Sequence, residues 1–214
     1  MLSLNVLFSQ EGELYDLLEG SAWEAQRNVE LLDRYLRART GIIGPLLDLD
    51  DFELARRNNR QRARRITAML AQTGATLPFG GEEIEALSYA LQGITRLAEK
   101  LVERLSVYPR SLPEKIFQRQ SPPLKDAVEA AGLMVGQLRE QWNLETIQTC
   151  QDRIQAAEGD ADRALLTGLQ ELNRKAHDPR ELVILKQVHE TIAEAIDRCR
   201  DAGNAVHRIV LAHA

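Results

Sequence analysis

Four acidic residues near the C-terminal end of the chain have the spacing of a line along one side of a helix. Glu190, Glu194, Asp197 and Asp201 are separated by steps of four, three and four residues, which places them about one turn apart on the same side. Like charges in such a line repel one another unless water, an arginine or a metal ion balances them. What lies beside this acidic line is therefore expected to decide the chemistry of this part of the protein.

Two carboxylate pairs are the candidate metal ligands. Glu158 and Asp162 form one pair and Asp197 and Asp201 the other, each with the four-residue spacing that puts both side chains on adjacent turns of one face. If the two helices are antiparallel neighbours, the pairs approach one another. Carboxylate oxygens are hard ligands and suit magnesium, calcium, manganese or iron better than zinc. Such pairs are also common on solvated helices, so the spacing alone leaves both interpretations open.

A run of arginines is the candidate contact surface for a partner or an anion. Within ten residues the chain carries Arg56, Arg57, Arg60, Arg62, Arg64 and Arg65. Such a run is most often a solvated face, but guanidinium groups also bind phosphate or carboxylate oxygens in pairs. We select Arg56, Arg57, Arg60 and Arg64 as the contact residues. Nucleic acid is a disfavoured partner, because the net charge is −5 and the pI is near 5.5.

No residue pattern of a known enzyme accompanies these charges. None of the four histidines follows a Glu or Asp at the spacing of a di-iron bundle, and neither a phosphate-binding loop nor a nucleophile stands out. His189 is expected to be a hydrogen-bonded core histidine. Cys150 and Cys199 lie at apolar positions without a CxxC partner and are expected to be buried free thiols. The sequence therefore predicts a protein that is not an enzyme.

Apolar periodicity predicts long helices that position these charges. Aromatic residues make up only 5% of the chain, which favours helices over strands. The spacing predicts helices at residues 11–39, 51–72, 81–107, 124–141 and 144–174 and from residue 179 onward, with residues 1–9 as an arm. Asp178 followed by Pro179 is a strong helix start. Four prolines between residues 108 and 123 indicate a crossing between two halves, residues 10–107 and 122–214, of one domain covering residues 1–214.

The last of these helices carries the apolar seam on which the others are expected to pack. Steps of three and four residues connect its members. They are Leu182, Leu185, His189, Ile192, Ile196, Cys199, Gly203, Val206 and Val210. No run of about 18 apolar residues and no signal-peptide pattern occurs, so a cytoplasmic location is expected.

Four segments spread over most of the chain have a recognisable family pattern. They are LYDLLEGSAWEAQRNVELL at residues 14–32, ITAMLAQTGATLPFGGEEIEALSYAL at residues 66–91, IQAAEGDADRALLTGLQEL at residues 154–172 and, the most specific, DRCRDAGNAVHRIVLAHA at residues 197–214. Through these segments the chain resembles the PhoU-like phosphate-transport regulators, in particular the accessory proteins of the low-affinity inorganic phosphate transporter Pit. The resemblance implies an all-α bundle of six helices in two three-helix halves, with surface motifs that bind clusters of iron or other metals.

The resemblance also marks where this chain departs from the family pattern. Glu158 and Asp162 match one metal motif and Asp197 and Asp201 another, with Asn204 at an adjoining position. The glutamate expected four residues before Asp197 is Ala193. In the first half Arg56 and Arg60 stand where acidic ligands are expected, and Gln92, Gly93 and Thr95 replace a cluster of aspartates. Metal binding, by iron or another divalent ion, is thus expected at most at the incomplete second motif.

The resemblance implies a non-enzymatic accessory protein that regulates phosphate uptake by contacting a membrane phosphate transporter or its regulators, peripherally from the inner face of the membrane. Two alternatives stay open. A helical scaffold would form a homodimer through an exposed apolar seam, and a metal-dependent hydrolase of phosphate esters would need a metal with open coordination positions.

Overall fold

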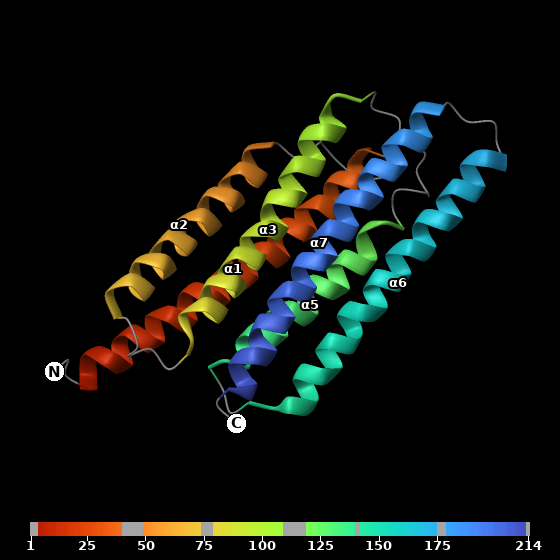
Figure 1. Cartoon of the computed structure of the whole chain (residues 1–214). Helices are drawn as coiled ribbons and strands as arrows, with labels where there is room; N and C mark the ends of the chain where they lie inside the picture. Colours follow the sequence, from red (N-terminus) through yellow and green to blue (C-terminus); the bar gives the residue numbers. More distant parts are fainter. Residues whose placement is uncertain are drawn as a thin grey trace.

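Six long helices account for nearly all of the structure, a computed structural model that describes residues 4–39, 49–73, 79–108, 119–139, 142–174 and 179–212. The helices are α1 (Leu4–Arg39), α2 (Leu49–Thr73), α3 (Gly81–Ser106), α5 (Ser121–Gly136), α6 (Leu144–Arg174) and α7 (Pro179–Leu211) (Figure 1). No strand occurs among the described residues. The prediction of an all-α protein is confirmed.

The helices form two three-helix halves that share one core. In the first half α1, α2 and α3 contact one another, and in the second α6 and α7 pack on α5 and on each other. The halves meet where α1 contacts α5 and α3 contacts α7, so these four helices form the centre of the bundle. Helices α2 and α6 lie at opposite edges (Figure 1). The prediction of two halves is confirmed; the exact division at residues 108–123 stays a prediction, because residues 109–118 lie outside the described residues.

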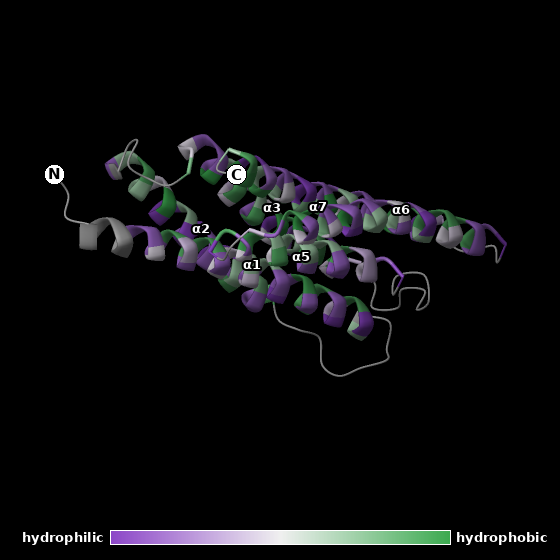
Figure 2. Ribbon diagram, turned by 90° about the horizontal axis from the view of Figure 1, so that it is seen from below, coloured by the Kyte–Doolittle hydropathy of each residue, from purple (hydrophilic) through white to green (hydrophobic). Residues whose placement is uncertain are grey.

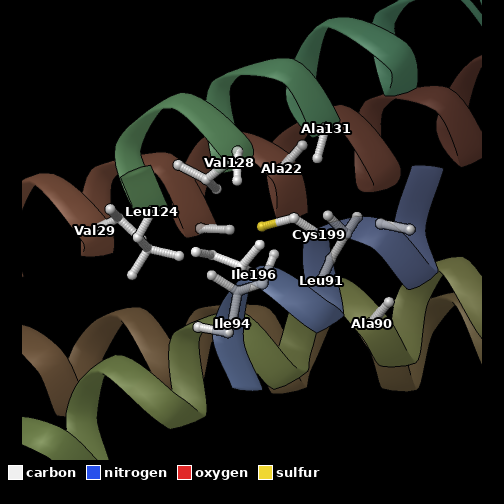
Figure 3. Packing of buried hydrophobic residues seen from close by; sticks show 14 of the residues in the cluster. Ala22, Val29, Ala90, Leu91, Ile94, Leu124, Val128, Ala131, Ile196 and Cys199 are labelled. Carbon is white, nitrogen blue, oxygen red and sulfur yellow. The ribbon is translucent and has the colours of Figure 1, made fainter. Parts of the chain in front are cut away.

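The seam of α7 lies in the core as expected. Ile192, Ile196 and Val206 are at most 1% exposed, and around Ile196 and Cys199 side chains from α1, α3, α5 and α7 converge (Figure 3). Gly203 lets α5 approach α7 closely, since a Cβ built there would lie 3.1 Å from the Met134 sulfur. The outer faces are polar, and each helix carries both hydrophilic and hydrophobic residues (Figure 2). Burial of this stripe by the other helices is what determines the bundle.

The helix boundaries agree with the sequence except in two places. Helix α1 begins at Leu4 rather than after an arm of nine residues, since no Pro or Gly in LNVLFSQ opposes helix formation. Helix α5 spans Ser121–Gly136 rather than residues 124–141. It can start before Pro122 and Pro123 because proline is tolerated in the first turn, where the missing N–H would have no partner. The predicted cap Asp178 and the loops 40–48 and 74–78 lie outside the described residues.

Candidate functional site

Two of the four carboxylates predicted as metal ligands, Glu158 of α6 and Asp197 of α7, are joined by an arginine in the groove between these helices. Arg200 Nη1 donates to Glu158 Oε2 at 2.8 Å, and Arg200 Nη2 donates to Asp197 Oδ1 at 2.7 Å. Partial burial lowers the pKa of Arg200, but Asp197 and Glu158 outweigh that effect and hold the pKa above its usual value. The guanidinium thus stays charged and supplies the cation between these two carboxylates.

The other two predicted ligands also face cationic or basic groups. Asp201 accepts a hydrogen bond from Arg198 Nη1 at 3.0 Å. Asp162 Oδ1 lies 3.5 Å from His189 Nε2, about one helical turn along α6 from Glu158 and its contact with Arg200. His189 is 8% exposed, as expected of a core histidine, although its Nδ1 is buried without a hydrogen-bond partner. The four residues therefore do not converge on one point.

This arrangement does not fit a bound metal ion. Within the described residues no three His, Cys, Asp or Glu side chains come close enough to share one, and Arg200 holds the oxygens that would have to turn toward it. Three of the four residues in the acidic line of α7 pair with arginine or lysine instead, since Glu190 pairs with Lys186 at 3.7 Å in addition to the pairs of Asp197 and Asp201. A polar cavity of about 360 Å³ lies beside Arg200 and is lined by Glu158 and Asn204 among others.

We predict that Arg200→Ala tightens the binding of Mn²⁺ at this groove at least about tenfold, because it frees two carboxylates without moving their helices. The measurement is a calorimetric titration of the wild type and the variant with Mn²⁺, Mg²⁺ and Fe²⁺. Arg208→Ala, which removes an exposed arginine at the end of the same helix, is the matched control. Equal affinities of the wild type and Arg200→Ala for the metal ions would contradict the assignment of Arg200 as the cation that neutralises these carboxylates.

The arginine run of α2 divides into two groups. Arg62 and Arg65 turn toward α1, where Arg62 Nη1 lies 3.2 Å from Glu24 Oε2 and Arg65 Nε lies 2.6 Å from Glu13 Oε1. Both hold α2 against α1. Arg57, Arg60 and Arg64, three of the four selected contact residues, are exposed. Their spacing of three and four places them on one face of the helix.

Arg56, the fourth selected residue, joins α2 to α3. Its Nε donates to Glu99 Oε2 at 2.8 Å, although the Arg56 side chain remains 47% exposed. Glu99 is buried, and its second oxygen, Oε1, has no hydrogen-bond partner. Burial raises the pKa of Glu99, and the nearby Arg56 offsets this only in part.

Arg56 and Arg60 together line a cavity between α2 and α3. Its volume is about 170 Å³, and Tyr89, Gln92, Gly93, Thr95 and Arg96 complete the lining. The sequence pointed to Arg56 and Arg60 but missed Arg96, Glu99 and Arg200. The spacing of Arg200, three residues after Asp197, could have indicated it as a partner. No local pattern indicated Arg96.

The two cysteines carry no chemistry in this arrangement. Cys150 and Cys199 are buried free thiols, as predicted. Burial raises the pKa of both thiols, so the reactive thiolate is disfavoured at each position.

Comparison with known proteins identifies the fold. No protein-family model and no curated protein matches the sequence. Two crystal structures of proteins from Shewanella oneidensis MR-1 do match the structure of this chain. One, of a PhoU-like protein, has a TM-score of 0.78 at 16% identity and covers 92% of this chain and 99% of that one. The other, described as a PhoU-like phosphate regulatory protein, has a TM-score of 0.72 at 15% identity and covers 93% and 99%.

The chain therefore has the PhoU-like fold over nearly its whole length. The fold defines a class of helical-bundle proteins. Arginines occupy both outer grooves, α2–α3 in the first half and α6–α7 in the second. No helix among the described residues is long and apolar enough to cross a membrane.

Proposed function

We propose that the protein is a non-enzymatic accessory protein that regulates inorganic phosphate transport, acting from the cytoplasm through contacts with a membrane transporter of the Pit type or with its control apparatus. The observation that supports this function is the likeness of 93% of the chain to a structure described as a PhoU-like phosphate regulatory protein. The arginine between the carboxylates of α6 and α7 favours a role in binding partners over metal-dependent hydrolysis.

The outer face of α2 is the proposed contact surface. Arg57, Arg60 and Arg64 project from one side of a helix that lies at the edge of the bundle (Figure 1). Exposed arginines that are not held by acidic neighbours are available to carboxylates of another protein. The expected partner surface is therefore acidic and faces the cytoplasm. Metal binding by Glu158, Asp162, Asp197 and Asp201 stays a prediction for the titration described above.

We predict that the double change Arg57→Glu and Arg64→Glu abolishes capture of the transporter and reproduces the effect of deleting the gene on phosphate uptake. Reversing two charges on one face replaces attraction with repulsion, while both side chains are exposed and the bundle is left intact. The measurements are uptake of radioactive phosphate by cells and affinity capture from their detergent-solubilised membranes under phosphate-rich and phosphate-poor growth.

Arg163→Glu on α6 is the control for reversing an exposed charge elsewhere on the protein, because this arginine contacts only Asp160 of its own helix among its described ion pairs. Normal uptake in the deletion strain under both growth conditions would overturn the proposed function. Normal capture by the double variant would leave the function standing but move the contact surface away from α2.

A further inference from the structure

The cavity between α2 and α3 has a strongly positive lining for a protein with a net charge of −5. Arg56 and Arg60 reach it from α2, and Arg96 reaches it from α3. Among the described residues, the carboxylate that forms an ion pair with one of these three arginines is that of Glu99, which pairs with Arg56. Three guanidinium groups against one carboxylate leave an excess of two positive charges around a small volume. In a cavity with protein walls, such an excess attracts anions more strongly than it would on an open surface.

Two of the three guanidinium groups are free to bind a ligand. Within residues 49–73 and 79–108, neither Arg60 nor Arg96 forms an ion pair. This differs from Arg62 and Arg65 of the same run, which are held by glutamates of α1. Like charges that converge without partners repel one another, and a bound anion would relieve that repulsion.

A fourth arginine lies at the margin of the same cavity. The Arg198 guanidinium lies 5.8 Å from the ring centroid of Tyr89, which lines the cavity. Arg198 Nε is buried and has no hydrogen-bond partner, although Nη1 donates to Asp201. The side chain passes so close to Gly93 that a Cβ at residue 93 would lie 2.9 Å from Arg198 Cδ. Glycine at this position therefore lets Arg198 of α7 approach the cavity wall.

The cavity is suited to a small ligand. At about 170 Å³ it is smaller than the roughly 300 Å³ at which pockets for drug-sized molecules begin. Arginines match tetrahedral oxyanions well, since each guanidinium presents parallel N–H donors to two oxygens. Gln92 and Thr95 add polar groups to the same wall. A divalent cation is excluded by the sign of the lining.

We propose that the α2–α3 cavity binds a small multivalent oxyanion of the inorganic phosphate class, held by Arg60 and Arg96 with Arg56 as a third donor. The binding site itself is inferred from the cavity. The further idea that the protein senses the transported anion through this site rests on the proposed function.

Glu99 is an internal competitor for the anion in this arrangement. It accepts from Arg56 Nε at 2.8 Å, and its negative charge offsets the charge of Arg56, which lines the cavity. Glu99→Gln removes that charge but keeps an oxygen that can accept from Arg56. The variant is therefore expected to bind the oxyanion several-fold more tightly than the wild type, an outcome that general damage to the fold would not produce.

The test is an isothermal titration of the purified full-length protein with sodium phosphate at constant ionic strength in chloride. Arg60→Gln and Arg96→Gln are each expected to weaken binding at least about tenfold, as expected for the loss of a charge-assisted hydrogen bond. Arg57→Gln and Arg64→Gln are the matched controls, because they remove the same charge from α2 but do not line the cavity. They are expected to leave the affinity within about twofold, since exposed charges contribute little.

Two further titrations identify the source of the oxyanion. Sulfate and a nucleoside triphosphate are titrated in the same buffer, and tighter binding of the nucleotide would assign the site to a phosphoryl group rather than to free phosphate. Thermal unfolding of every variant, measured by circular dichroism, shows whether it is folded.

Absence of phosphate binding by the folded wild type, or equal losses in the cavity variants and their controls, would overturn the proposal. Either result would leave the proposed function untouched, because transport and capture are measured separately in cells. Conversely, normal uptake in a deletion strain together with cavity-dependent binding would overturn the regulatory function and keep the site.

Discussion

Ile196→Ala is expected to lower the free energy of unfolding by about 2–5 kcal/mol, the usual range for truncating a buried aliphatic side chain to alanine. Ile196 is 1% exposed at the centre of α7, and side chains of α1, α3 and α5 surround this point (Figure 3). Truncation would leave a cavity where the two halves meet. Because elements of both halves would have to move together to fill it, we expect little relaxation and a loss near the upper end. Chemical denaturation monitored by far-ultraviolet circular dichroism measures it.

Leu166→Ala is the matched control for this prediction. It also shortens an aliphatic residue within a long helix, but Leu166 is 59% exposed on α6. We expect a change of no more than about 0.5 kcal/mol, as at other surface positions. If both variants lost similar stability, the four-helix centre would not be the main source of stability of this bundle.

Glu24→Ala is expected to destabilise the protein by about 3 kcal/mol, because it removes the buried acceptor of several hydrogen bonds, and a hydrogen bond to a charged group contributes roughly 1.5–3 kcal/mol. Glu24 is a carboxylate of α1 that is only 1% exposed. It accepts from Arg62 Nη1 at 3.2 Å and from Asn58 Nδ2 at 3.3 Å, both on α2. Arg27 of its own helix lies 3.5 Å away. Removing the carboxylate leaves these donors without their acceptor and loosens α2, so the same denaturation experiment reports the loss.

Glu13→Ala is the control that distinguishes the loss of a buried contact between α1 and α2 from the loss of an exposed ion pair between the same helices. Glu13 also joins α1 to an arginine of α2, Arg65, but both side chains are well exposed to solvent. We expect a loss below about 1 kcal/mol, since exposed ion pairs are weak. A loss for Glu24→Ala as small as that for Glu13→Ala would show that burial does not strengthen the contact between these helices.

Arginines lie in both outer grooves, at or beside positions where the sequence resemblance led us to expect metal ligands. In the α6–α7 groove Arg200 joins Glu158 to Asp197. In the α2–α3 groove arginines line a cavity at positions where acidic ligands were expected. Positive side chains therefore stand in both grooves, and they favour recognition of anions or acidic surfaces over coordination of metals.

The sequence by itself determined the helices, the core face of α7 and the run of arginines. The reason is that a helix is specified by neighbours three and four residues apart, so the seam through Ile192 and Ile196 is readable locally. It also located the carboxylate pairs. The three misplaced ends lie before Glu11, before Leu124 and after Gly136; they concern the ends of helices, where few local interactions decide.

Only the tertiary structure decided which partner each charged side chain contacts. Glu158 and Arg200 are 42 residues apart and form an ion pair because α6 packs beside α7. Arg96 had no local pattern that indicated it, yet the packing of α2 on α3 places it in a cavity with Arg56 and Arg60. An ion pair or a cavity depends on the rotation and offset of two helices relative to each other, which the packing of many distant side chains determines together.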